Sequence, residues 1–197
     1  MDVDDLTATE LRALDDAFAA NERAARALVA GLSEAAGGWR AAASSWSVAE
    51  CLDHLAHANR VYLTAMEPAA ASALARGSRR RRPALPGFFG GWFVRSLEPS
   101  SRLKSRAPRA IQPRTAPALS DAMVSFLAAH EDVRAFLRKY ADIDLAGERF
   151  RNPFVRGLRF SLATGLHVIA AHERRHLSQA RQVREAAARA IEVTQPS

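Results

Sequence analysis

The sequence has too little cysteine for covalent cross-links. Cys51 is the only cysteine among 197 residues, so no disulfide can form within the chain and no cysteine-rich zinc site is available. Aromatic residues make up only 7% of the chain, but 48% of the residues are apolar and 25% are charged, which excludes wholesale disorder. A chain of this length can bury a core without disulfides, and we expect one domain over residues 1–197.

Long hydrophobic runs are also missing. The longest uncharged stretches, residues 83–94 and 160–172, are too short to cross a bilayer as helices. The first six residues, Met-Asp-Val-Asp-Asp-Leu, are acidic and contain no apolar core, so no secretory signal is expected. We therefore expect a cytoplasmic protein with no transmembrane segment.

Acidic residues are nearly absent from one region. Between residues 76 and 117 only Glu98 opposes eleven basic residues, so this segment carries a net charge of +10 and the rest of the chain −3. The basic residues are Arg76, Arg79, Arg80, Arg81, Arg82, Arg95, Arg102, Lys104, Arg106, Arg109 and Arg114. The overall charge of +7 thus comes from one segment of the sequence.

Two interpretations of this basic segment differ in function. Its arginines and its aromatic residues could contact nucleic-acid phosphates or a membrane surface. Alternatively, it is a long solvated connection whose aromatic residues cover one end of the fold. We favour the connection, because the apolar piece at residues 88–94 is short and interrupted by glycine. Nucleic acid is accordingly not an expected partner.

Outside this segment, apolar residues recur with a period near 3.6, which predicts long helices at residues 4–32, 48–75, 120–140 and 161–191. Ser47 and Glu50 have the spacing of a capping box, and Ser120 is a candidate N-cap. Gly37 and Gly38 should end the first helical region. Residues 88–94 favour a short helix, and a loop should contain Gly147, Asn152 and Pro153. Four long helices with a crossover between the second and third predict an all-α four-helix bundle.

Two of the six histidines have the spacing of metal ligands. His172 and His176 lie four residues apart on the last predicted helix, so both imidazoles project from one face. With Glu173 they also match the zincin pattern, in which the glutamate is a general base. A zincin needs an edge strand for its substrate and a third ligand, and neither is evident after His176. The third ligand is better sought on another helix, where His54 is the leading candidate.

Several short motifs together point to a known family. His54 lies eight residues after Trp46, and Gln179 lies three residues after His176. The other matching positions are Pro108, Gln112 and Pro113 in the connection and Asn152, Pro153 and Phe154 before the last helix. Over roughly residues 34–184, the sequence resembles the DinB-like (DinB superfamily) metal-dependent four-helix-bundle proteins.

The resemblance implies that His54, His172 and His176 bind a divalent metal, with water at an open position. Zinc is expected first, with nickel or iron as alternatives. Three neutral imidazoles leave a positive centre, which lowers the pKa of a bound water or thiol. Glu173 points about 100° away from His172 around the helix, so we expect it to support the ligands rather than bind the metal. Gln179 should either hydrogen-bond the site or line the bundle.

The remaining candidates have ordinary structural explanations. Cys51 is close to the face of His54, but a buried structural cysteine is more common than a soft ligand or a reactive thiol. His57 is expected to pack at the rim of the site. His130 and His167 are expected to be core or surface histidines without a metal role.

The resemblance leaves two classes of function open and names no catalytic residue. The first is a metal-dependent hydrolase or a transferase that uses a low-molecular-weight thiol and a small-molecule substrate, with the transferase favoured. The family name refers to damage-inducible genes, which implies expression under stress. The second is a non-catalytic, metal-stabilised bundle that binds a partner or nucleic acid through the basic crossover. A homodimer is plausible in either case.

Overall fold

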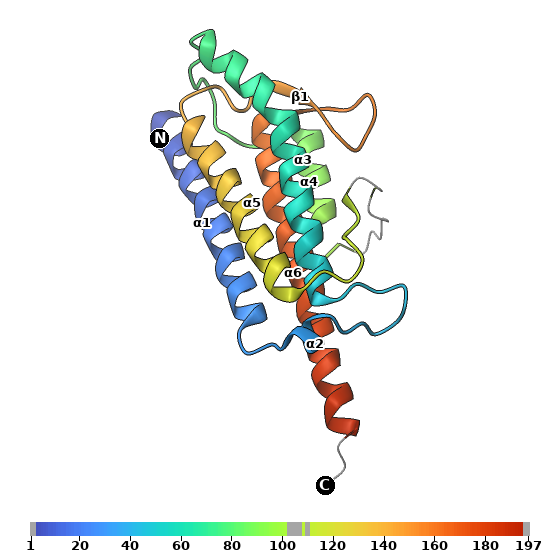
Figure 1. The fold of residues 1–197 in the computed structure, drawn as a ribbon. Coiled ribbons are helices and arrows are strands. Elements are labelled where there is room, and N and C mark those ends of the chain that lie inside the picture. Colours follow the sequence, from blue (N-terminus) through green and yellow to red (C-terminus); the bar gives the residue numbers. More distant parts are fainter. Residues whose placement is uncertain (1–2, 102–107, 109–110, 195–197) are drawn as a thin grey trace.

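The computed structural model describes residues 3–101, 108 and 111–194. Within these ranges the chain forms an elongated bundle of helices with one small hairpin (Figure 1). The elements are α1 (Val3–Val29), α2 (Glu34–Gly37), α3 (Val48–Ala75), α4 (Phe88–Leu97), α5 (Leu119–Lys139), β1 (Arg149–Arg151), β2 (Arg159–Ser161) and α6 (Leu162–Thr194). The expected all-α bundle is confirmed.

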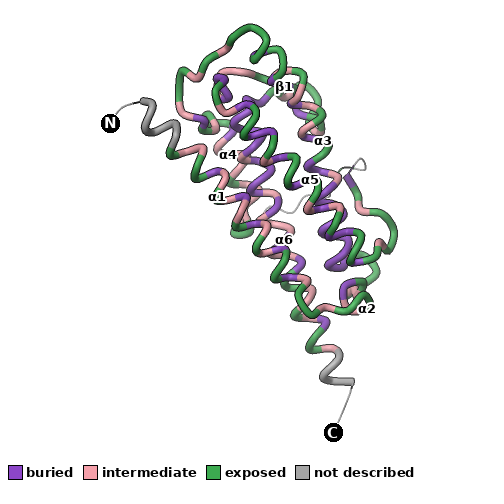
Figure 2. The backbone as a smooth tube through the Cα atoms, turned by 60° about the vertical axis from the view of Figure 1, so that its left-hand side comes forward, coloured by how far each residue is buried: buried purple, intermediate pink, exposed green. Residues whose placement is uncertain are grey.

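The four long helices pack so that α1 and α3 each contact both α5 and α6. Their apolar faces meet in the interior, where the exposed fraction of the side chains falls to nearly zero (Figure 2). The largest fully buried side chains include Phe18, Leu52, Leu55, Phe126, Leu166 and Ile169. Burial of these faces is the main source of helix stability, because isolated helices of this length are marginal in water. The arrangement places the first half of α3 beside α6.

The capping box at the start of α3 is confirmed. The Ser47 hydroxyl accepts a hydrogen bond from the Glu50 backbone N–H at 3.2 Å, and the Ser47 N–H donates to the Glu50 carboxylate at 2.9 Å. Both bonds satisfy backbone groups that a helix leaves unpaired at its first turn. They fix the direction in which the chain enters α3, seven residues before His54.

The other predicted cap is wrong. The N-cap of α5 is Ala118, and Ser120 lies inside the helix. The carboxylate of Glu34 instead accepts hydrogen bonds from the N–H groups of Leu119 (2.6 Å) and Ser120 (3.0 Å). Glu34 begins α2, a short helix that the sequence did not predict. Since the cap comes from a residue 85 positions away, no local pattern could have revealed it.

The first helix ends earlier than predicted. It stops at Val29, and Gly31 follows with a φ of +68°, a left-handed conformation that glycine adopts without strain. Gly37, which was expected to end this region, is instead the last residue of α2. It is buried against Leu119, whose side chain would lie within 2.7 Å of a Cβ at this position, so a larger residue would not fit.

The predicted loop before the last helix contains an antiparallel hairpin. Phe150 of β1 pairs with Phe160 of β2, and both side chains are buried while the arginines beside them are exposed. Three residues per strand are too few for a recognisable alternation in the sequence. The hairpin covers the end of the bundle next to α3 and α6.

The basic crossover is partly described. Its helix, α4, is longer than the predicted piece at residues 88–94 and packs against α6. Four of the basic residues predicted to belong to the crossover, Arg102, Lys104, Arg106 and Arg109, lie outside the described residues. Among the helices in the described ranges, none is both long and apolar enough to cross a membrane.

Candidate metal centre

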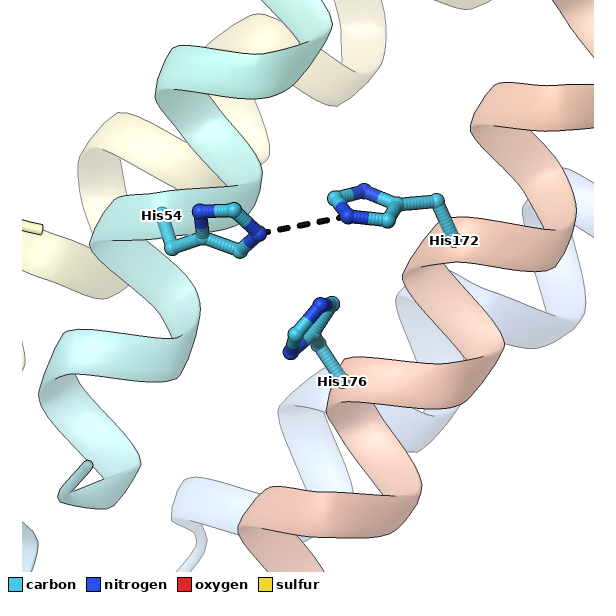
Figure 3. Close-up of side chains that lie close together, drawn as sticks. All are labelled: His54, His172 and His176. Atoms are coloured by element: carbon cyan, nitrogen blue, oxygen red, sulfur yellow. Dashed lines mark hydrogen bonds between the residues drawn. The ribbon is translucent and has the colours of Figure 1, made fainter. Parts of the chain in front are cut away.

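The three predicted ligands come together between α3 and α6. His54 projects from α3, and His172 and His176 project from successive turns of α6 toward it (Figure 3). One nitrogen of each ring lies within 4.8 Å of the others, and the Nε2 atoms of His54 and His172 are 3.2 Å apart. No other group of three or more potential ligands is found in the described part of the chain.

The shortest of these spacings matches that of two nitrogens bound to one divalent cation. Zinc–nitrogen bonds of about 2.0–2.1 Å at a tetrahedral centre separate two nitrogens by roughly 3.3 Å, close to the spacing of His54 and His172. Three imidazoles leave a fourth position open, which is the ligand number of catalytic zinc sites. The donor set therefore fits the metal that the sequence resemblance implied.

A backbone carbonyl orients His54. The Nδ1–H of its ring donates to the carbonyl oxygen of Ile111 at 2.5 Å, so the lone pair of Nε2 faces His172. Such a bond to the outer nitrogen fixes the tautomer and rotation of a metal-binding histidine. The Trp46 ring packs on His54 and His176, with centroid distances of 4.7 and 5.6 Å. His54 is thus held from two sides.

Burial keeps the cluster in the form that binds metal. Loss of solvation lowers the pKa of His54 to about 4, despite the opposing bond to Ile111, and nearby His57 adds to the shift. Burial likewise lowers the pKa of His176 to about 3 and that of His172 well below its usual value, with the neighbouring histidines adding to both shifts. All three rings are neutral at pH 7, so their lone pairs are free for a cation.

The crossover is fastened over the site by a residue next to His54. The buried Asp53 carboxylate accepts hydrogen bonds from the backbone N–H of Arg114 (2.8 Å) and from its Nε (2.8 Å), and it forms an ion pair with the same guanidinium, whose Nη2 is 2.7 Å away. Burial would raise the pKa of Asp53, but these bonds outweigh it and hold the pKa below its usual value. Because Arg114 lies three residues after Ile111, the same clamp holds the carbonyl that orients His54. Sequence reasoning missed Asp53, although a carboxylate in an apolar run beside a ligand histidine was a usable signal.

Glu173 belongs to a separate polar cluster. Its fully buried carboxylate accepts hydrogen bonds from Asn21 (2.9 Å), Asn59 (2.8 Å) and the Nδ1–H of His130 (3.0 Å). These partners lie on α1, α3 and α5, so Glu173 connects α6 to each of the other long helices. Its hydrogen bonds do not reach the three clustered histidines, and any support that it gives to them acts through the placement of α6.

The remaining predicted residues lie around the cluster or away from it. His57 is half-buried, with Nδ1 3.5 Å from the Asp53 carboxylate, and His167 donates from Nε2 to the carbonyl of Ala84 at 3.1 Å. Contact with the Gln179 side chain partly offsets the lowered pKa of His176. Cys51 is buried as predicted, and burial raises the pKa of its thiol to about 12.

The fold and the site together define a class: a four-helix bundle whose second long helix and last helix present three histidine nitrogens to one point. The chain belongs to the DinB superfamily, whose family model matches residues 17–180. The resemblance carried by Trp46, His54, His172, His176 and Gln179 is thereby confirmed. Comparisons with curated proteins and with solved structures found no match.

Proposed function

We propose that the protein is a metal-dependent enzyme that binds one divalent cation through His54, His172 and His176. The observation that carries the proposal is the convergence of three neutral imidazole nitrogens within 4.8 Å. His130 and the partly buried His167 instead bond to a carboxylate and to a backbone carbonyl, and neither belongs to such a group of histidines. Zinc is the first candidate, and nickel and iron also accept imidazole ligands.

A cation held there supplies Lewis acidity and lowers the pKa of a bound water or thiol. The chain itself orients the ligands and shapes the approach to them. Ile111 fixes the ring of His54, and Trp46 covers one side of the cluster. His172 and His176 keep part of their surface accessible, whereas His54 has none, so a substrate would approach from the side of α6.

Between the two candidate reactions, we favour transfer involving a low-molecular-weight thiol over hydrolysis. The family resemblance suggests this choice, and the state of Cys51 agrees with it. The only thiol of the chain is buried and stays protonated at neutral pH, because the pKa is raised to about 12. A thiol nucleophile would therefore have to come from a second substrate.

The test begins with metal analysis of protein purified without a nickel column. We expect about one equivalent of metal per chain, and loss of that metal in His54→Ala and His172→Ala. A screen of low-molecular-weight thiols against electrophilic acceptors should then detect turnover that His172→Ala abolishes. Protein that holds no stoichiometric metal, and gains none on reconstitution, would rule the proposal out.

The competing function is that of a non-catalytic bundle that acts through its basic crossover. It predicts that different substitutions abolish the biological role. Substitution of the four residues Arg79–Arg82 by serine would then abolish the biological role, while His172→Ala would affect only stability. Arg79, Arg81 and Arg82 are exposed, so their replacement should leave the fold intact. Complementation of a deletion strain by the two variants separates these functions.

A further inference from the structure

The helix of the crossover exposes large aromatic side chains to water. Phe88, Phe89 and Trp92 of α4 are 85%, 78% and 57% exposed, and Leu85 just before the helix is 48% exposed. Exposure of several neighbouring apolar side chains is unfavourable and is typical of a surface that a partner covers. The metal site does not use these residues, which lie outside the histidine cluster.

The opposite face of α4 is firmly packed. Gly90 is buried, and a Cβ there would come within 2.5 Å of the Thr164 hydroxyl on α6. The Phe93 ring packs against Phe160 of β2 at a centroid distance of 5.1 Å. α4 therefore lies alongside α6 (Figure 1), and Phe88, Phe89 and Trp92 are exposed on a helix that is held in place. Their exposure is a consequence of the fold and does not reflect a loose segment.

Arginines from two distant segments meet beside these aromatic residues. The hairpin region, residues 149–161, contains four arginines and no acidic residue. A cavity of about 480 Å³ is lined by Arg82, Arg149 and Arg159 together with Phe88 and Phe89.

In the part of the chain that the structure describes, a carboxylate pairs with only one of these three arginines. Arg82 has an ion pair with Asp144 at 3.4 Å, and Glu148 pairs with Arg76. No ion pair of Arg149 or Arg159 is found among the described residues. The surface is thus apolar at its centre and positive at its edge.

We propose that this surface, formed by Leu85, Phe88, Phe89, Trp92, Arg82, Arg149 and Arg159, docks onto a bilayer that contains anionic phospholipid. The aromatic side chains would enter the boundary between headgroups and acyl chains, and the arginines would contact the lipid phosphates. Aromatic residues combined with arginine are typical of protein surfaces that lie in the membrane interface.

Charge and ring geometry favour a bilayer over other occupants. A two-fold contact with a second copy would place the arginines of one chain against those of the other. Single-stranded nucleic acid needs flat rings on which bases stack, but Phe88 and Phe89 are nearly perpendicular, at 89°, and cover each other edge to face. A bilayer accepts aromatic side chains in any orientation.

The experiment is flotation of the full chain with vesicles of phosphatidylcholine alone or mixed with phosphatidylglycerol. We expect flotation only with the mixed vesicles, weaker at high salt. Phe88→Ser with Phe89→Ser should reduce partitioning at least about tenfold, because two apolar side chains no longer enter the lipid. Arg149→Ser with Arg159→Ser should also reduce it, through lost attraction to the phosphates.

Matched control variants show whether flotation depends on this surface or on any loss of apolar or positive side chains. Val124→Ser removes an apolar side chain that is 68% exposed on α5, and Arg23→Ser with Arg181→Ser removes the same charge elsewhere. Both should float as the original chain does, and all variants should keep their circular dichroism spectrum and metal content.

Three outcomes overturn the proposal. The original chain could fail to float with the mixed vesicles, or the aromatic variant could float equally well. The third is that the aromatic substitutions abolish a dimer, seen by light scattering, or a complex with an oligonucleotide, while flotation is unaffected. The surface would then bind that partner and not a bilayer.

Discussion

Arg114 lies at the surface, but its contacts help to hold the buried ring of His54 in place. Its backbone and side chain bind Asp53, and three residues earlier the Ile111 carbonyl holds the ring of His54. In the sequence, Arg114 is only one of several charges in a basic connection. In the structure, this arginine attaches the end of the crossover beside the histidine cluster.

Arg114→Ala should therefore weaken metal binding without removing a ligand. The crossover would lose its side-chain attachment to Asp53, and the Ile111 carbonyl would hold His54 less well. Loss of such outer partners typically lowers metal affinity by about 10–100-fold. Competition with a chromophoric chelator measures the change.

Arg26→Ala is the matched control, since within the described ranges the guanidinium of Arg26 pairs only with Glu22, one turn away on α1. Equal metal affinity in Arg114→Ala and the original chain would mean that the clamp does not support His54.

Cys51 should be inert in the folded protein. It is completely buried, and its thiol has a pKa of about 12, so almost no thiolate exists at neutral pH. Iodoacetamide at pH 8 should leave the native chain unmodified and should alkylate it fully in denaturant, as mass spectrometry would show. Rapid alkylation of the native chain would contradict this and would also remove an argument for an external thiol.

At the scale of the elements, the long helices and their main contacts follow from the sequence, because the apolar period and the capping box at Ser47 are local signals. The clustering of three histidines could also be predicted: the i, i+4 spacing of His172 and His176 places both on one face, and the family resemblance added His54. What could not be predicted depends on residues that meet only in the folded chain. The cap of α5 by Glu34 and the bond from Ile111 to His54 span 85 and 57 positions.

Substitution of Glu173 tests whether its hydrogen bonds to the other long helices position α6. Removal of its carboxylate takes away the acceptor of buried donors on His130 and Asn59, whereas the amide of Asn21 keeps its bond to the Ala170 carbonyl. A buried donor left without an acceptor costs about 1–3 kcal/mol, so Glu173→Ala should lower the free energy of unfolding by at least that order. It should also weaken metal binding, since the ligands on α6 flank this position. Urea denaturation and chelator competition measure the two effects.

Glu185→Ala supplies the comparison, because Glu185 lies on the same helix but is exposed. Its effect should stay within about 0.5 kcal/mol. If Glu173→Ala lowers stability but binds metal as tightly as the original chain, the cluster stabilises the bundle without positioning the histidines.

At the scale of the whole molecule, the distribution of charge differs from that along the sequence. Along the sequence, the excess of positive charge lies in residues 76–117, and the rest of the chain has a small net negative charge. The fold brings the hairpin arginines Arg149 and Arg159 beside Arg82, although they belong to that remainder. Several crossover charges are meanwhile paired within the protein, as Arg76 is with Glu148 and Arg114 with Asp53. Net charge by segment therefore locates the positive surface only in part.

A cation at the histidine cluster should stabilise the whole bundle, because it joins α3 to α6. A ligand that binds only the folded state adds about 2.7 kcal/mol when present at 100 times its dissociation constant. The apo chain should accordingly melt several degrees below the metal-loaded chain, and added zinc should restore the difference. In His54→Ala this dependence should vanish even though His172 and His176 remain, since both of these lie on α6 and cannot join two helices. Calorimetry with and without chelator decides the question: a melting temperature that ignores zinc in the original chain would mean that the three imidazoles do not hold a metal.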